Sequence, residues 1–169
     1  MINNKILHAH VLRVYTWELL KANIGWTEVN GMIPIVPLGD EPRLSDSGKS
    51  YIIYGYAEQA PGSTKEVRTG SLTYRIIART FAELGEITNV ITAGFEELDR
   101  SAHRVNLWSS NYSGGAFIGI RFGTLEVTYI EGGEPADQEG GPVDGLLNIE
   151  YSYIIERNVK QYQADGTWA

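Results

Sequence analysis

The sequence predicts an α+β domain: an antiparallel β-sheet with two main helices packed on one face. Two stretches place apolar residues three and four positions apart, as one face of a helix requires. Four other stretches have the character of strands. Three of them alternate apolar with polar residues, as half-buried strands do, and the fourth is rich in aromatic and β-branched residues. They fall into two pairs with the second helix between them. We therefore expect a single domain at residues 1–157, followed by a polar C-terminal tail at 158–169.

The first helix is expected over about residues 5–22. Val14, Trp17 and Leu20 recur near one face of it, so that face should be buried. Gly25 follows at the position where a helix end often needs a left-handed residue, because glycine adopts that conformation without steric cost.

The first strand pair follows a stretch that proline keeps out of a helix. Pro34 and Pro37 hold the chain extended. Tyr51 to Tyr56 is rich in aromatic and β-branched residues, and Ser71 to Ala78 alternates, so the two should form an antiparallel hairpin with a long connection. One face of the second strand carries its larger apolar residues, namely Leu72, Tyr74, Ile76 and Ala78.

The second helix opens with a capping box. The Thr80 side chain can accept the Glu83 backbone N–H, and the Glu83 carboxylate can reach back to the Thr80 backbone. An apolar stripe then runs to about Leu107. Gly85 and Gly94 each cost this helix about 1 kcal/mol relative to alanine, which suggests that another element approaches closely there.

The second strand pair is expected at residues 117–130 and 146–155, joined by an acidic, glycine-rich loop at 131–145. The spacing of the acids in this loop does not match a calcium-binding loop. A solvated loop is the simpler interpretation, and a loop that orders against a protein partner is the alternative. The candidate partner-contact residues are Glu131, Glu134, Asp137, Glu139 and Asp144.

Composition indicates a globular protein with generous aromatic content. Of the 169 residues, 43% are hydrophobic and 21% are charged, with four Trp, ten Tyr and no Cys. Tyr and Trp favour protein–protein interfaces, and Tyr151, Tyr153 and Trp168 are the candidate interface aromatics. The formal net charge of −7 argues against a protein that grips nucleic acid through a basic surface.

The residues do not form a recognisable catalytic, cofactor-binding or metal-binding pattern. His8 and His10 are two positions apart on a helix and so do not face each other, and His103 fits a structural position near a helix C-terminus. Gly48-Lys49-Ser50 echoes the end of a phosphate-binding loop, but Arg43 stands where that motif needs a glycine. We expect no enzyme, although a dispersed carboxylate site with hydrolytic activity is an alternative.

No stretch approaches the roughly 20 apolar residues that span a bilayer. The N-terminal residues lack the apolar core and the cleavage site of a signal peptide. We therefore expect synthesis in the cytoplasm and no membrane contact.

The order and character of these elements resemble the tail terminator proteins of long-tailed bacteriophages, also called tail-completion proteins. The resemblance covers most of residues 5–157 and lies in the layout of the chain. The matching pieces are the first helix, the crossing at Pro34 to Pro37, the strand Tyr51-Ile52-Ile53-Tyr54, the strand ending in Ile76-Ile77-Ala78-Arg79, the helix from Phe81 and a closing hairpin.

That resemblance implies a structural virion protein assembled in the host cytoplasm. Such a protein forms a homo-hexameric ring that caps the completed tail tube and offers a docking surface to the head. Its partners would be the tail tube protein and a head-completion or neck protein, and DNA would pass the lumen without specific binding. A head–tail connector or neck protein at the same junction, or a protein-binding module unrelated to phage, are the alternatives.

Overall fold

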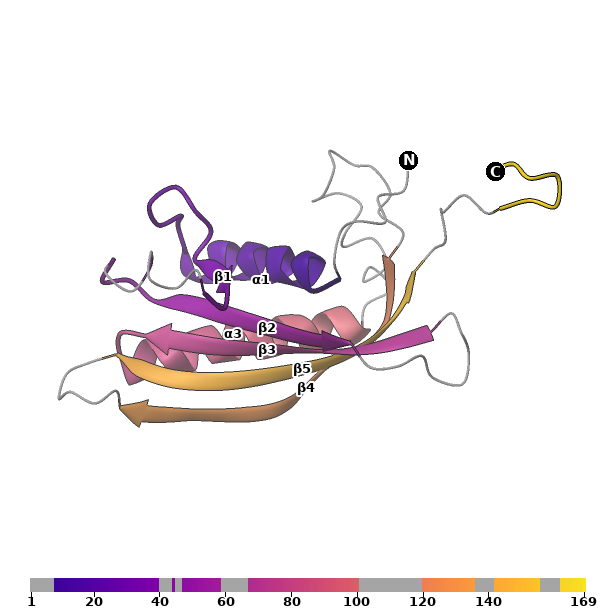
Figure 1. Cartoon of the computed structure of the whole chain (residues 1–169). Helices are drawn as coiled ribbons and strands as arrows, with labels where there is room; N and C mark the ends of the chain where they lie inside the picture. Colours follow the sequence, from indigo (N-terminus) through magenta and orange to yellow (C-terminus); the bar gives the residue numbers. More distant parts are fainter. Residues whose placement is uncertain are drawn as a thin grey trace.

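A computed structural model describes residues 8–39, 44, 47–58, 67–100, 120–135, 142–155 and 162–169. These residues form two main helices and five strands, which confirms the α+β class (Figure 1). In chain order the elements are α1 (His8–Ile24), β1 (Ile35–Pro37), β2 (Tyr51–Glu58), β3 (Val67–Ala78), α3 (Phe81–Arg100), β4 (Ile120–Pro135) and β5 (Val143–Ile155).

The sheet is mixed, so the prediction of a purely antiparallel sheet was wrong. Its strand order is β1-β2-β3-β5-β4. The pairs β2–β3, β3–β5 and β5–β4 are antiparallel, whereas β1 runs parallel to β2, with Ile35 opposite Ile52. The Pro34 carbonyl accepts the Ile52 N–H at 2.9 Å. The proline-rich crossing is thus extended, as predicted, and its last residues form a short edge strand.

One hydrophobic core joins the helices to one face of the sheet. The same-facing residues Leu72, Tyr74 and Ile76 of β3 are each 0% exposed, which confirms the predicted inward face. Side chains of α1 and α3 belong to the same cluster, and the two helices contact each other (Figure 1). The helical members of the cluster are Leu12, Trp17, Leu20, Leu84, Ile87, Ile91 and Phe95.

The other face of the central strands is largely polar. Thr73 and Arg75 of β3 are exposed there. Asn148 of β5 accepts hydrogen bonds from Ser71 (2.8 Å) and Thr73 (3.2 Å) through its side-chain oxygen. A sheet with one covered face and one polar face is the usual arrangement for antiparallel strands.

Glycine explains how closely α3 can pack. A Cβ at Gly94 would overlap the Leu19 side chain of α1, and a Cβ at Gly145 of β5 would lie 2.7 Å from Leu84. The predicted close approach is therefore confirmed at Gly94. The predicted close approach was wrong at Gly85, where a Cβ would meet nothing within 4 Å.

Element boundaries differ from the sequence expectation mainly around β4. This strand continues to Pro135, and β5 already begins at Val143. The predicted loop at 131–145 was therefore too long. Gly132 pairs with Gly145, and a register shift follows before Glu134 meets Asp144. Glycines that suggested a loop lie beside this irregularity, as glycines in strands often do.

The helix ends agree better with expectation. Gly25 has φ of 66°, which confirms the left-handed residue after α1. The described part of the second helix ends at Arg100, and the predicted continuation to Leu107 lies outside the described residues. So does the predicted start of the next strand at residue 117.

Candidate functional site

Side chains from two segments, the 47–50 turn and residues 80–83, meet at the N-terminus of α3. The Glu83 N–H donates to Thr80 Oγ1 at 3.1 Å, which confirms one half of the predicted capping box. The second half, a hydrogen bond from the Thr80 backbone to the Glu83 carboxylate, was predicted with the wrong partner. Glu83 Oε2 accepts hydrogen bonds from the Arg79 N–H (3.2 Å) and from Ser50 Oγ (2.8 Å). The carboxylate thus ties the 47–50 turn to the helix while it neutralises the positive end of the helix dipole.

Two adjoining hollows open at this end of the molecule, and we call them together the Lys49–Arg79 hollow. The first, of about 230 Å³, lies between the 25–34 loop, the 48–50 turn and residues 79–83. The second, of about 260 Å³, continues past Tyr51 and Pro142. Gly48, Lys49 and Arg79 line both.

The walls of this hollow are partly apolar, and two of its three charged lining residues are basic. Trp26, Val29 and Pro34 line the first part. Lys49 and Arg79 are both exposed, whereas the Glu83 carboxylate is already hydrogen-bonded to Ser50 and to the Arg79 backbone. Space, apolar walls and a few directed polar groups are what a docking site needs.

The Gly48-Lys49-Ser50 sequence lies in this hollow without forming a phosphate-binding loop. It precedes β2, and Gly48 has φ of 68° in the turn. Ser50 Oγ donates to Glu83 Oε2, so a carboxylate already takes the place at the helix N-terminus where a phosphate would bind.

At its C-terminal end the chain forms a small hairpin, which we call the C-terminal arm (residues 162–169). Tyr162 pairs with Trp168 in an antiparallel bridge, and their rings meet edge to face with centroids 5.3 Å apart. The Gln163 N–H donates to the Thr167 carbonyl at 2.7 Å. Gly166 adopts φ of 84° in the turn, as a tight hairpin requires.

Asp165 holds the turn of the arm. Its Oδ1 accepts the Thr167 hydroxyl at 2.6 Å and the Thr167 N–H at 3.0 Å. These two hydrogen bonds, the hydroxyl one first, lower the pKa of the Asp165 carboxyl below its usual value. The predicted polar tail is therefore locally folded in its last eight residues.

The arm nevertheless lies apart from the core. All eight of its residues are exposed, with Tyr162 at 64% and Trp168 at 65%. In Figure 1 the arm projects beyond the end of the sheet. Trp168, a candidate interface aromatic, is thus available to a partner.

Tyr151 was wrongly predicted as an interface residue. It is 2% exposed and belongs to the core, where its ring lies over Gly70 of β3. Register places residue 151 on the inward face, and alternation alone could not tell which face of the strand the helices would cover. Tyr153 lies in β5, and its side chain lies outside the described residues.

The five acidic candidates do not form one loop cluster. Glu131 and Glu134 belong to β4, opposite Leu146 and Asp144. Asp144 binds Arg75 on the polar face, through Oδ2 at 2.7 Å from Nε. The remaining two candidates, Asp137 and Glu139, lie outside the described residues.

Sequence reasoning missed both the hollow and the folded arm. The arm had a signal, because Asp165-Gly166 between two aromatic residues is typical of a tight hairpin. The hollow had no such signal, since its walls come from separate segments of the chain, at residues 25–34, 48–50 and 79–83.

Within the parts of the chain that the structure describes, no three acidic or histidine side chains gather closely enough to hold a metal ion. Among the described helices, none is long and apolar enough to cross a membrane. The chain matches no known family model, and no curated protein sequence is significantly similar to it.

Proposed function

We propose that this chain is a structural, non-catalytic subunit of a phage tail, a tail terminator that assembles with copies of itself into a ring. The ring caps the finished tail tube and presents a surface for the head. The resemblance in element layout supports the phage context, and the surfaces described above support assembly as the mode of action.

The open edge of β4 carries the proposal. β4 is 16 residues long and lies last in the strand order. Among the described residues it pairs on one edge only, with β5. A long strand with a free edge can accept a strand from another subunit, and a closed ring uses up such edges.

Irregularities along β4 favour a matched partner over indiscriminate pairing. The pairing with β5 shifts register at three places, between Phe122 and Thr124, between Val127 and Tyr129, and between Gly132 and Glu134. Such bulges bend and twist a strand. A twisted edge disfavours generic aggregation and remains open to a strand of the same shape.

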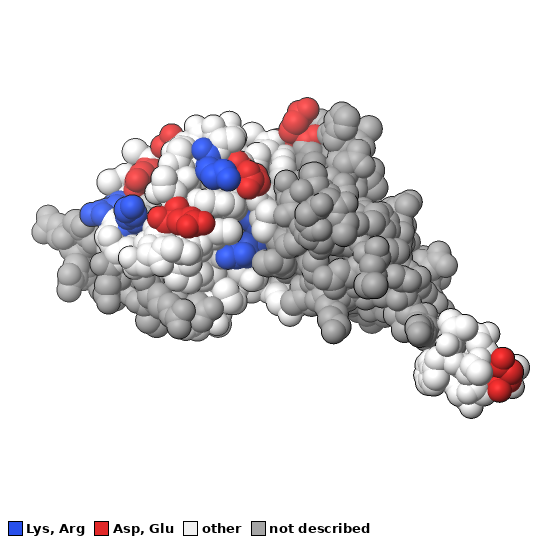
Figure 2. Space-filling model, turned by 90° about the horizontal axis from the view of Figure 1, so that it is seen from above, with Lys and Arg blue, Asp and Glu red and all other residues white. Residues whose placement is uncertain are grey.

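Surface charge is compatible with a ring that DNA traverses. The net charge is −7, and like charge keeps DNA from adhering. Figure 2, which views the molecule from above, shows acidic and basic side chains interspersed over the described residues of that side, without a broad basic patch.

A variant of the β4 edge tests this function. Thr128 has no opposite residue in the β4–β5 register, because it lies at the second shift. Thr128→Pro should therefore spare most of the β4–β5 ladder while blocking the outer edge. Thr128→Ala is the matched control.

We expect wild-type protein and Thr128→Ala to form a closed oligomer by light scattering and to cap tail tubes in negative-stain images. Thr128→Pro should remain folded by circular dichroism and lose the oligomer. A wild-type protein that stays monomeric at high concentration and ignores tubes would rule the function out. Binding to heads but not to tubes would instead identify a neck protein at the same junction.

A further inference from the structure

We propose that the C-terminal arm of one copy docks into the Lys49–Arg79 hollow of the next copy. The inference rests on the proposed ring and names one contact that holds it together. It assigns a role to two features that the described fold leaves unused, the exposed aromatic pair and the Lys49–Arg79 hollow.

The arm has the properties of an interface anchor. Its rings already hold each other edge to face, and its turn is fixed by Asp165, so little conformational freedom would be lost on binding. Exposed Tyr and Trp side chains contribute strongly to binding when a partner covers them. Tyr162 and Trp168 keep about two thirds of their surface in water within one chain.

Charge and shape match the arm to the hollow. The arm contains the acidic Asp165 and no Lys or Arg. The hollow has Lys49 and Arg79 at its rim, and the apolar Trp26 and Pro34 in its wall. An aromatic ring can pack on that wall while the acidic turn faces the two cations.

The arm cannot reach the hollow of its own chain. The hollow lies at the Ala78 end of β3, whereas β5 ends beside Val67 at the other end. β3 has 12 residues, which span about 40 Å. The seven Cα–Cα steps from Ile155 to Tyr162 extend at most about 25 Å, and the hairpin, four residues long, adds about 13 Å.

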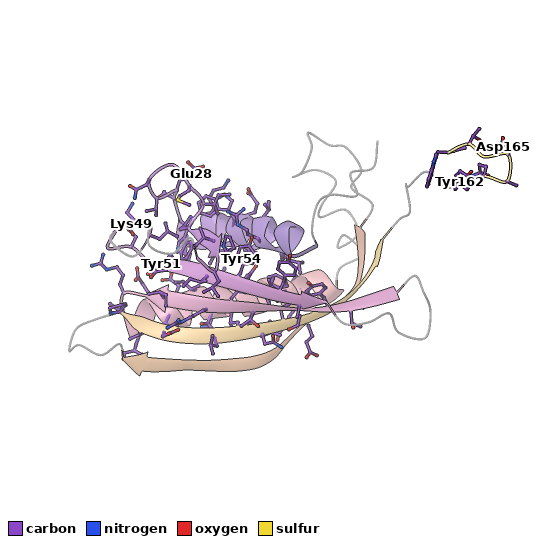
Figure 3. All side chains as sticks on the ribbon, viewed as in Figure 1. Glu28, Lys49, Tyr51, Tyr54, Tyr162 and Asp165 are labelled. Carbon is purple, nitrogen blue, oxygen red and sulfur yellow. The ribbon has the colours of Figure 1, made fainter. Side chains whose placement is uncertain are left out.

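Figure 3 shows the same separation. Lys49 and Tyr51 lie at one end of the molecule, and Tyr162 and Asp165 lie beyond the other end. A contact between an arm and a hollow at opposite ends joins copies head to tail. Such a contact closes into a ring when its rotation permits, which fits the proposed assembly.

Two variants test the contact by complementation. Deletion of residues 162–169 leaves the hollow intact, and Lys49→Glu leaves the arm intact. Lys21→Glu, an equal charge change at an exposed position on α1, is the control. We expect each of the first two variants alone to lose the oligomer in analytical ultracentrifugation, with at least about a thirtyfold weaker subunit affinity. Mixed together, they should form a heterodimer with one arm in one hollow.

The lack of cysteine in the chain allows a direct second measurement. A protein with both Lys49→Cys and Ala164→Cys, treated with a short bis-maleimide, should give covalent ladders of the subunit. Each single-cysteine protein should give at most dimers. Circular dichroism and thermal unfolding check that every variant is folded.

The outcomes separate this contact from the proposed function. If the arm deletion still forms the wild-type oligomer, or if the double-cysteine protein gives no ladder, the arm–hollow contact is wrong and the ring stands. If the wild-type protein itself never assembles, both are wrong. Loss of assembly in both variants, a heterodimer on mixing and a ladder together establish the contact.

Discussion

The phenol oxygen of Tyr15 donates a hydrogen bond of 2.7 Å to the carbonyl oxygen of Gly94. This bond joins α1 to α3 where the two helices pack closely together. Leu19, one turn further along α1, occupies the space that a side chain at residue 94 would need. Tyr15 also meets the Phe95 ring edge to face at 5.2 Å.

Alanine substitutions at the two glycines of α3 should have opposite effects. Gly85→Ala meets nothing within 4 Å, so it should stabilise the protein by up to about 1 kcal/mol through helix propensity. Gly94→Ala would press on Leu19, and overpacking costs about 1–3 kcal/mol. Denaturant unfolding should show Gly94→Ala as the less stable of the pair. Equal stabilisation by both would contradict the close crossing.

Stability should fall at alkaline pH because of Tyr15. Burial, and to a lesser extent the nearby Glu97 carboxylate, raises the pKa of Tyr15 from 10.0 to about 12. Folding therefore favours the protonated phenol, so this contribution is fully present below pH 10 and is lost as pH rises toward 12. Thermal unfolding at pH 8 to 11 should show the decline. Tyr15→Phe should lower stability at pH 8 and flatten the alkaline decline; an unchanged profile would disprove the assignment.

A buried hydroxyl pair should couple α1 to β3. Thr16 Oγ1 and the Tyr74 hydroxyl lie 2.7 Å apart, and both residues are 0% exposed. Removing one partner of a buried hydrogen bond costs about 1–3 kcal/mol. Thr16→Val and Tyr74→Phe should each destabilise the protein, and the double variant should cost less than their sum. Strict additivity in this double-mutant cycle would show that the two hydroxyls do not interact.

The cap of α3 should contribute measurably to stability. Thr80→Ala removes the acceptor of the Glu83 N–H, which should cost about 0.5–2 kcal/mol. Thr88→Ala, the same change in the middle of α3, is the control and should be neutral or slightly stabilising because alanine favours a helix. Chemical denaturation compares the two. Similar losses in both variants would argue against a capping role for Thr80.

Much of the local structure could be predicted because its causes lie within a few residues. Apolar spacing identified α1 and α3, alternation identified β3 and β5, and aromatic and β-branched content identified β2, although β3 begins at Val67 and not at Ser71. The Thr80 cap and the left-handed Gly25 follow from local hydrogen bonding and sterics. The acidic 131–145 stretch misled us, because glycine is common both in loops and beside bulges.

The candidate sites were less accessible from the sequence. Tyr151 and Trp168 are both aromatic residues near the C-terminus, yet one is buried in the core and the other is exposed on the arm. Residue type predicts only that an aromatic side chain will be packed against other groups. The sheet register decides whether those groups belong to the core or to another molecule. The Lys49–Arg79 hollow depends on the meeting of three segments, and no short sequence pattern indicates such a meeting.

The sequence by itself determined the α+β class, the inward face of β3, the Thr80 cap of α3 and the left-handed Gly25 after α1, because side-chain periodicity and short-range hydrogen bonds act within single elements. Only the tertiary structure decided that β1 joins the sheet in parallel and that the Leu19 side chain packs against Gly94. It also decided that the arm and the hollow lie at opposite ends of the molecule. Those features depend on long-range packing, in which residues far apart in the chain compete for the same space.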